Sequence, residues 1–97
     1  MHKPLIILAQ IEAKPESVDL MKAELTKLIE PTRKENGCLQ YDLHQDNEKP
    51  EFFVFYEVWE NRELWQVHMK NENLAAFAKT TEGAIKTFTL NEMTQVD

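Results

Sequence analysis

Phe52-Phe-Val-Phe-Tyr-Glu-Val-Trp59 is the stretch of the sequence that decides the fold. Seven of these eight residues are aromatic or β-branched, a composition typical of a β-strand. Side chains alternate between the two faces of a strand, so the single polar residue, Glu57, shares its face with aromatic rings. The residues on that face are Phe53, Phe55, Glu57 and Trp59. A carboxylate buried among rings is costly without a partner, so Glu57 is expected either to form a salt bridge or to take part in chemistry.

Further strand and helix patterns flank this strand. Loose alternation predicts a first strand over Leu5–Ala13. Apolar residues spaced three and four apart follow Ser17, a good N-cap residue, and predict an amphipathic helix. Pro31 is expected to kink or end that helix, and Gly37 stands where a C-terminal glycine is expected. The remaining predicted elements are a strand over Cys38–Asp46, helices over Asn61–Lys70 and Asn73–Lys79, and a strand over Lys86–Val96.

The second and third strands are expected to form a hairpin, because the turn-forming residues Asn47–Pro50 lie between them. Alternation in the second strand places Leu39, Tyr41 and Leu43 on one face. It places His44 on the opposite, polar face.

The order strand, helix, strand, strand, helix, strand predicts an α+β fold: a ferredoxin-like βαββαβ subunit with an antiparallel sheet. Ninety-seven residues fit a single domain over 1–97. Helices cover only one face of such a sheet, yet the 52–59 strand is apolar on both faces. A second copy of the chain would cover the other face, so we predict a homodimer in which two sheets pack face to face.

Composition argues against several classes of partner. The net charge of −6 and the pI of about 5.0 disfavour nucleic acid, which calls for a basic patch. No apolar run approaches the roughly 18–20 residues of a membrane span, and Leu5–Ala9 is too short for the core of a signal peptide. A single cysteine, Cys38, forms no internal disulfide and fits a reducing compartment. We therefore expect a cytoplasmic protein that binds neither nucleic acid nor membrane.

Four segments together resemble the antibiotic biosynthesis monooxygenase (ABM) superfamily, and most closely its small quinol monooxygenase-like members. They are Gly37–Asp46, Phe53–Asn61, Trp65–His68 and Phe77. The resemblance implies a dimeric α/β barrel of ferredoxin-like subunits. It also implies oxidation of quinols or polycyclic phenols with O₂ and without metal or flavin. Other members of this superfamily degrade haem or isomerise a phosphorylated signalling molecule.

The sequence departs from the family pattern at two places. Quinol monooxygenase-like members often carry a second histidine five residues after the first, where this chain has Asn73. Haem-degrading members carry an iron-ligating histidine near Phe77 and Ala78, and neither is histidine here. The resemblance therefore disfavours haem oxygenation.

His68 and Glu57 are the candidate catalytic residues. The ordinary imidazole pKa of about 6.5 suits His68 to act as a general base or as a donor to a phenolic oxygen. The alternative is a histidine at the edge of the core, bonded to a carbonyl. Glu57 would orient His68 or hold it charged. Its alternative is a structural salt bridge to Arg33, Arg62 or a lysine.

Other side chains are candidates for holding a substrate. Four aromatic residues of the third strand and the following helix are expected either to form a slot for a planar ligand or to pack as ordinary core. They are Phe53, Phe55, Trp59 and Trp65. Tyr41 and Tyr56 would bond a substrate oxygen or belong to the core. His44 would reach a ligand or simply face solvent.

Nothing in the sequence predicts a cofactor. His2, His44 and His68 lack the spacing of metal ligands, and no glycine-rich phosphate loop is present. We therefore expect a cofactor-independent monooxygenase that oxidises a small quinol or phenol with O₂. One alternative is an isomerase or tautomerase of a small hydroxyketone, which needs the same acid–base pair but no O₂. Another is a non-catalytic stress protein that binds a small molecule.

Overall fold

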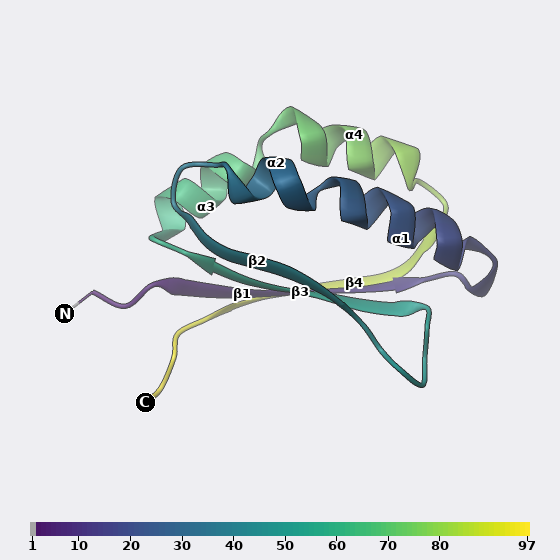
Figure 1. Ribbon diagram of the computed structural model, residues 1–97, viewed down its shortest axis with the longest axis horizontal. Coiled ribbons are helices and arrows are strands. Elements are labelled where there is room, and N and C mark those ends of the chain that lie inside the picture. The colour runs from purple at the N-terminus through teal and green to yellow at the C-terminus, as the bar shows by residue number, and fades with distance from the viewer. Residues whose placement is uncertain (1) are drawn as a thin grey trace.

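The computed structural model describes residues 2–97 as an antiparallel sheet of four strands with all the helices on one face (Figure 1). The strand order is β2-β3-β1-β4. The elements, in chain order, are β1 (Leu5–Ala13), the 3₁₀ turn η1 (Pro15–Ser17), α1 (Val18–Lys27), α2 (Ile29–Arg33), β2 (Cys38–Gln45), β3 (Phe52–Trp59), α3 (Arg62–Met69), α4 (Glu72–Thr80) and β4 (Ile85–Met93). The predicted α+β ferredoxin-like subunit is confirmed.

The strand β3 lies inside the sheet, between β2 and β1, as its composition predicted. Residues that face the helices are buried, and the alternate residues are half-buried. The buried set is Phe53, Phe55, Glu57 and Trp59, and the half-buried set is Phe52, Val54, Tyr56 and Val58. The helices of this chain therefore cover one apolar face of β3 and leave the other open (Figure 1).

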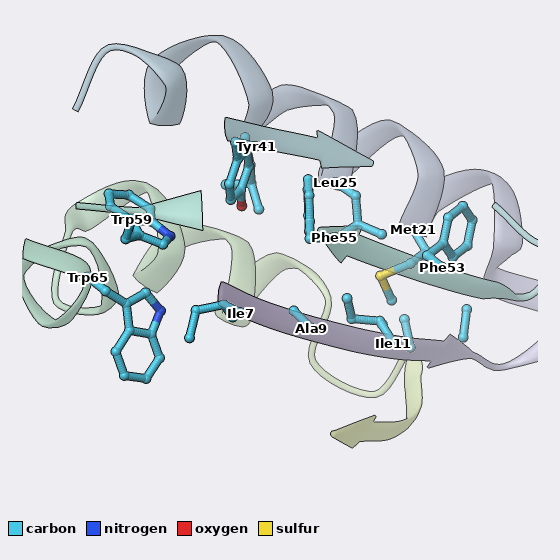
Figure 2. Close-up of a cluster of buried hydrophobic side chains, with 13 residues drawn as sticks. Ile7, Ala9, Ile11, Met21, Leu25, Tyr41, Phe53, Phe55, Trp59 and Trp65 are labelled. Atoms are coloured by element: carbon cyan, nitrogen blue, oxygen red, sulfur yellow. The ribbon is translucent and has the colours of Figure 1, made fainter. Parts of the chain in front are cut away.

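The hydrophobic core fills the space between the sheet and the helices. Met21 and Leu25 of α1 are fully buried against alternate residues of β1 and β3. In Figure 2, Phe53 lies near Met21 toward one end of the sheet, whereas Trp59 and Trp65 lie toward the other end. The middle of the sheet, between these two ends, is where the candidate site is found.

The expectation for β2 is wrong at one position. Leu39 was expected on the face of Tyr41, but its side chain is 61% exposed while Tyr41 is buried. The pairing between β2 and β3 shifts register between Cys38 and Gln40. Such a bulge inserts an extra residue, so the alternation begins only after Leu39.

Pro31 breaks the first helix, but the break precedes the proline. A proline ring collides with the carbonyl four residues earlier, which here belongs to Lys27. The helix accordingly stops at Lys27, and α2 starts at Ile29. Ser17 makes no capping hydrogen bond, because the chain is already turned into η1 when it reaches α1.

The other helix boundaries are set by asparagine caps. Asn61 caps α3 as predicted, since its side chain accepts a hydrogen bond of 2.9 Å from the Leu64 N–H. Asn71 does the same for Leu74, so α4 begins at Glu72 rather than at residue 73.

The last strand ends at Met93 rather than Val96, because its pairing partner β1 runs out at Leu5–Ile6. Across residues 2–97, no helix has both the length and the apolar character of a membrane span.

Gly37 allows the turn after α2 to lie directly on α3. Its φ is +87°, in the left-handed region that glycine tolerates. A Cβ at this position would lie 2.5 Å from Leu64 Cδ1 and 2.8 Å from Leu64 Cβ. Glycine is therefore required both by the backbone conformation and by the close approach to Leu64.

Gly37→Ala is expected to lower the free energy of unfolding by on the order of 2–5 kcal/mol, from left-handed strain and from overpacking against Leu64. Gly83→Ala is the matched control, since Gly83 has a φ of +84° but open space around its Cβ position. Strain alone predicts a loss of about 1–2 kcal/mol there. Urea denaturation of the three proteins measures the difference, and equal losses would contradict the close-packing argument.

Candidate active site

A cavity of about 520 Å³ lies between the sheet and the helices. Its walls are mostly apolar and come from α1, β1, β3, β4 and α4, including Leu25, Ile11, Phe55, Phe88, Leu90 and Leu74. Glu57 and His68 are among the polar residues that line it. The volume falls within the range of small-molecule sites, and a few polar groups in an apolar wall are typical of such sites.

Glu57 is a buried carboxyl group without an ion pair. Its side chain is 4% exposed, and its partner is the Trp59 indole, whose Nε1–H donates to Glu57 Oε1 at 2.9 Å. The two arginines considered from the sequence pair elsewhere. Arg33 bonds Asp42 at 2.9 Å, and Arg62 bonds Glu92 at 2.7 Å. Within residues 2–97 Glu57 forms no salt bridge, so the expected structural ion pair is absent from the described part of the chain.

Burial without a cation changes the acidity of Glu57. Desolvation raises the pKa of this carboxyl from 4.5 to about 7, although the hydrogen bond from Trp59 opposes the shift. The nearby charge of Glu35 raises it further. At neutral pH Glu57 is therefore protonated in a large fraction of molecules and is able to donate a proton.

His68 lies on α3 and is buried, with Glu35 as its direct partner. The ring atom Nδ1 lies 3.0 Å from Glu35 Oε1. We assign the proton to Nδ1, because a carboxylate accepts and does not donate, and this leaves Nε2 free to accept a proton. Burial lowers the pKa of His68, with Glu35 opposing that effect, so the ring is a neutral base at pH 7. The expectation that Glu57 orients His68 is wrong, since Glu35 holds it.

Aromatic rings fix the plane of His68. Its ring centroid lies 4.7 Å from that of Trp59 and 5.7 Å from that of Tyr41. Tyr41 in turn stacks on Phe55 at 4.3 Å. Burial raises the pKa of Tyr41, so this residue stays a neutral phenol. Tyr41 packs in the core and also lines the cavity, so a bond from its hydroxyl to a substrate oxygen stays a prediction.

Only part of the predicted substrate-binding set meets this cavity. Phe55 lines it together with Glu57 and His68. Phe53, Trp59 and Trp65 are packed into the core on either side (Figure 2) and do not line it. Tyr56 and His44 lie on the open face of the sheet, where the His44 ring is exposed. The ligand-binding role of these five residues stays a prediction that the cavity does not support.

Sequence reasoning missed Glu35 and Asn71. Asn71 Nδ2 donates to Glu35 Oε2 at 2.8 Å. Glu35 is therefore held by two side chains, those of His68 on α3 and of Asn71 at the N-cap of α4. Glu35 and His68 are 33 residues apart, and no periodicity links them. The structure shows what brings them together: the close contact of Gly37 with Leu64 places the turn that carries Glu35 on the same face of α3 as His68.

Metal ligands do not gather in the described part of the chain. Across residues 2–97, no group of three or more His, Cys, Asp or Glu side chains is arranged to hold a metal ion. Cys38 is half-buried, and burial raises the pKa of its thiol, so it lacks the features of an activated nucleophile.

Comparison with known proteins identifies related sequences and structures. The family described as "Antibiotic biosynthesis monooxygenase" matches residues 4–80. The crystal structure of PA3566 from Pseudomonas aeruginosa superposes with a TM-score of 0.95 at 31% identity, covering 100% of this chain and 98% of that one.

Two curated relatives share part of their length with this chain. "Uncharacterized protein sll1783" of Synechocystis is 30% identical over 78% of this chain and 52% of its own length. "Putative monooxygenase Rv0793" of Mycobacterium tuberculosis is 33% identical over 57% of this chain and 54% of its own length. The chain thus spans about half the length of these two relatives.

The raised pKa of Glu57 predicts how stability depends on pH. Between about pH 4.5 and pH 7 the unfolded carboxyl is ionised while the folded one keeps its proton, so the unfolded state binds fewer protons. Stability therefore falls as pH rises through that window, by on the order of 3 kcal/mol, and the decline stops above about pH 7. Glu57→Gln keeps the shape and cannot ionise, so it should lack this component. Urea denaturation of both proteins at about pH 4.5 and pH 8 tests this, and parallel pH dependences would contradict the assignment.

Proposed function

Because the chain belongs to the antibiotic biosynthesis monooxygenase family, we propose that it oxidises a small quinol or phenol with O₂, using neither metal nor flavin. The observation that carries the proposal is the meeting of a buried acid and a buried base, Glu57 and His68, at one apolar cavity. The name of the Mycobacterium tuberculosis relative, "Putative monooxygenase Rv0793", supports a monooxygenase activity.

The two groups have the protonation states that such a reaction needs. Burial lowers the pKa of His68 and raises that of Glu57 to about 7, so the imidazole is a free base while the carboxyl retains a proton. Environments that move the pKa values of two neighbouring groups in opposite directions assign the base and the acid. His68 is therefore the base and Glu57 the acid.

The first step is removal of the hydroxyl proton from the substrate. The O–H bond breaks and an N–H bond forms at His68 Nε2, which leaves an electron-rich substrate anion. This anion gives one electron to O₂, and the resulting radical and superoxide combine to form a carbon–oxygen bond. The substrate itself is the reductant, so the step requires no other electron donor.

The second step converts the peroxide anion to product. Glu57 donates its proton to the terminal oxygen, giving a hydroperoxide. The ring carbon that bears the peroxide then loses its hydrogen as a proton while the O–O bond breaks, so a carbonyl forms at that carbon and the released hydroxide leaves with the proton as one water. A hydroquinone plus O₂ thus becomes a hydroxyquinone plus H₂O. One proton has been gained by His68 and one lost by Glu57, and both return to the starting state when product leaves.

The apolar walls of the cavity serve this chemistry in two ways. They hold an uncharged aromatic ring by dispersion and hydrophobic contact, with Phe55 and Leu74 among the lining residues. They also offer few polar groups that compete for the developing oxyanion, which strengthens its interaction with Glu57.

We further propose that the protein is a homodimer. The open face of the sheet carries half-buried apolar side chains in its two inner strands, such as Leu8, Val54 and Val58. Helices of this chain do not reach that face (Figure 1). A second sheet packed on it would bury these side chains and complete the barrel that the family resemblance implies.

His68→Ala should lower the turnover of a substrate found in a panel of hydroquinones by about 10²–10⁴-fold, because it removes the proton acceptor. O₂ consumption and product formation are measured together with the melting temperature. His2→Ala is the matched control, since His2 is exposed and bonds only the Glu60 carbonyl. Full activity in the His68 variant would mean that another group is the base.

The same panel separates monooxygenation from its alternatives. Product formation that requires O₂ supports the proposal. Conversion that proceeds equally well without O₂ would identify an isomerase or tautomerase that uses the same acid and base. Saturable binding with no conversion would identify a binding protein.

The homodimer is tested by analytical ultracentrifugation at micromolar concentration, where a mass of twice 11.4 kDa is expected. Val54→Lys places a charge on the open face and should shift the mass toward the monomer, because a buried unpaired charge is costly. Lys22→Glu on the exposed side of α1 is the control. A stable monomer of the unchanged protein would refute the face-to-face packing.

A further inference from the structure

We propose that Glu35 is the positioning residue of the catalytic base: it holds His68 in the tautomer that accepts the substrate proton, and it stabilises the imidazolium that forms. This inference rests on the proposed function, in which His68 is the base. It adds a residue that neither the sequence patterns nor the family match assigns.

The first support is the geometry of the contact. Glu35 Oε1 lies 3.0 Å from His68 Nδ1, and no other acidic side chain is within hydrogen-bond distance of this ring among residues 2–97. Nδ1 and Nε2 lie on opposite edges of imidazole, so an Nδ1–H donated to Glu35 leaves Nε2 unprotonated on the edge away from Glu35. His68 lines the cavity, and its Nε2 has no hydrogen-bond partner within the described residues.

The second support is the way in which Glu35 is fixed. Asn71 Nδ2 donates to Glu35 Oε2 at 2.8 Å, while Asn71 Oδ1 accepts from the Leu74 N–H at 2.9 Å. Both polar ends of Asn71 are therefore engaged, and its amide cannot turn over without losing both bonds. The backbone of the turn that follows Glu35 is also fixed, because Gly37 packs against Leu64. Leu64 lies one helical turn before His68 on α3.

The third support is that the side chains of His68 and Glu35 differ in their exposure to solvent. The side chain of His68 is 3% exposed, whereas that of Glu35 is 23% exposed. Glu35 and Asn71 also line a separate hollow of about 450 Å³ between α2 and α3, together with Pro31 and Val67. Glu35 is therefore more exposed to solvent than the ring that it contacts, and both of its carboxyl oxygens have side-chain partners, His68 at Oε1 and Asn71 at Oε2.

Among the described residues, no other titratable group near the ring of His68 compensates its positive charge. Glu57 on β3 faces the same cavity but is bonded to Trp59, and Tyr41 on β2 stays a neutral phenol. Lys70 and Glu82 also line the cavity, and neither hydrogen-bonds the ring within residues 2–97. Glu35 is therefore the group that compensates the positive charge when Nε2 takes a proton.

The test is Glu35→Gln, which keeps the size of the side chain. A glutamine amide can donate to Nδ1, which would place the imidazole proton on Nε2 and remove the acceptor. In Ser–His–Asp triads the equivalent amide substitution acts through the wrong tautomer and lowers kcat by about 10⁴-fold. We expect kcat on the identified quinol to fall by about 10²–10⁴-fold, with KM changed by less than about twofold. Glu63→Gln on the exposed side of α3 is the matched control and should be unchanged.

Nitrogen-15 NMR of the imidazole tests the inference without any substrate. His68 should be protonated at Nδ1 in the unchanged protein and at Nε2 in Glu35→Gln. Glu35→Asp retains the charge and should retain the Nδ1–H tautomer, and it serves as the second variant if Glu35→Gln fails to fold. If Glu35 has a purely structural role, Glu35→Gln should lower the melting temperature without changing the tautomer of His68 and without lowering kcat selectively over KM. That result would overturn the inference.

The two hypotheses fail in different ways. If no quinol is oxidised by the unchanged protein, the proposed function is refuted, and the tautomer measured by NMR still decides the role of Glu35. An Nε2-protonated His68 in the unchanged protein would overturn the positioning role even if quinol oxidation is observed.

Discussion

Burial of one face of β3 beneath the helices of the same chain is the constraint on which the rest of the structure depends. The aromatic rings of that face supply much of the core, and strand alternation carries Glu57 into the core with them. A single hydrogen bond from Trp59 does not replace the water that the carboxylate loses. The carboxyl therefore keeps its proton at a pH where an exposed glutamate has lost it.

The two glutamates that take part in the proposed reaction differ in how far they are exposed to solvent. Glu57 is sealed between sheet and helices and is partly protonated at neutral pH. Glu35 reaches an outer hollow, and its two carboxyl oxygens contact His68 Nδ1 and Asn71 Nδ2. His68 lies between the two glutamates, because it is bonded to Glu35 and lines the same cavity as Glu57. In the proposed reaction, Glu57 is the acid, His68 is the base and Glu35 is the group that supports the base.

The sequence predicted the elements whose signals are local. The composition of β3 and the cap at Asn61 each act within a few residues, and both were confirmed. The helix-capping position expected for Gly37 was wrong, because α2 ends at Arg33 with Lys34 as its C-cap. The bulge near Leu39 was missed because register depends on the partner strand rather than on β2 alone. Alternation also identified the buried face of β3, but not which part of that face would line a cavity. For this reason Phe53 and Trp59 were expected either beside a ligand or in the core, and they are packed in the core.

The contact between Glu35 and His68 was beyond local reasoning, since it joins a turn and a helix that are distant in sequence. The sequence showed instead a residue that conflicts with its surroundings, namely one carboxyl in an apolar strand. Such conflicts are expected where function is placed, because a side chain selected only for stability would not be charged there.

The stability and the proposed reactivity of this site have one physical origin. The desolvation that raises the pKa of Glu57 to about 7 also makes the folded state less stable once the unfolded carboxyl ionises. A change that admitted water to the cavity would return this pKa toward its ordinary value and relieve that destabilisation. The same change would remove the proton that the peroxide needs and solvate the substrate anion. A more stable variant of this kind would therefore be a poorer catalyst, because the burial of Glu57 is the source of both effects.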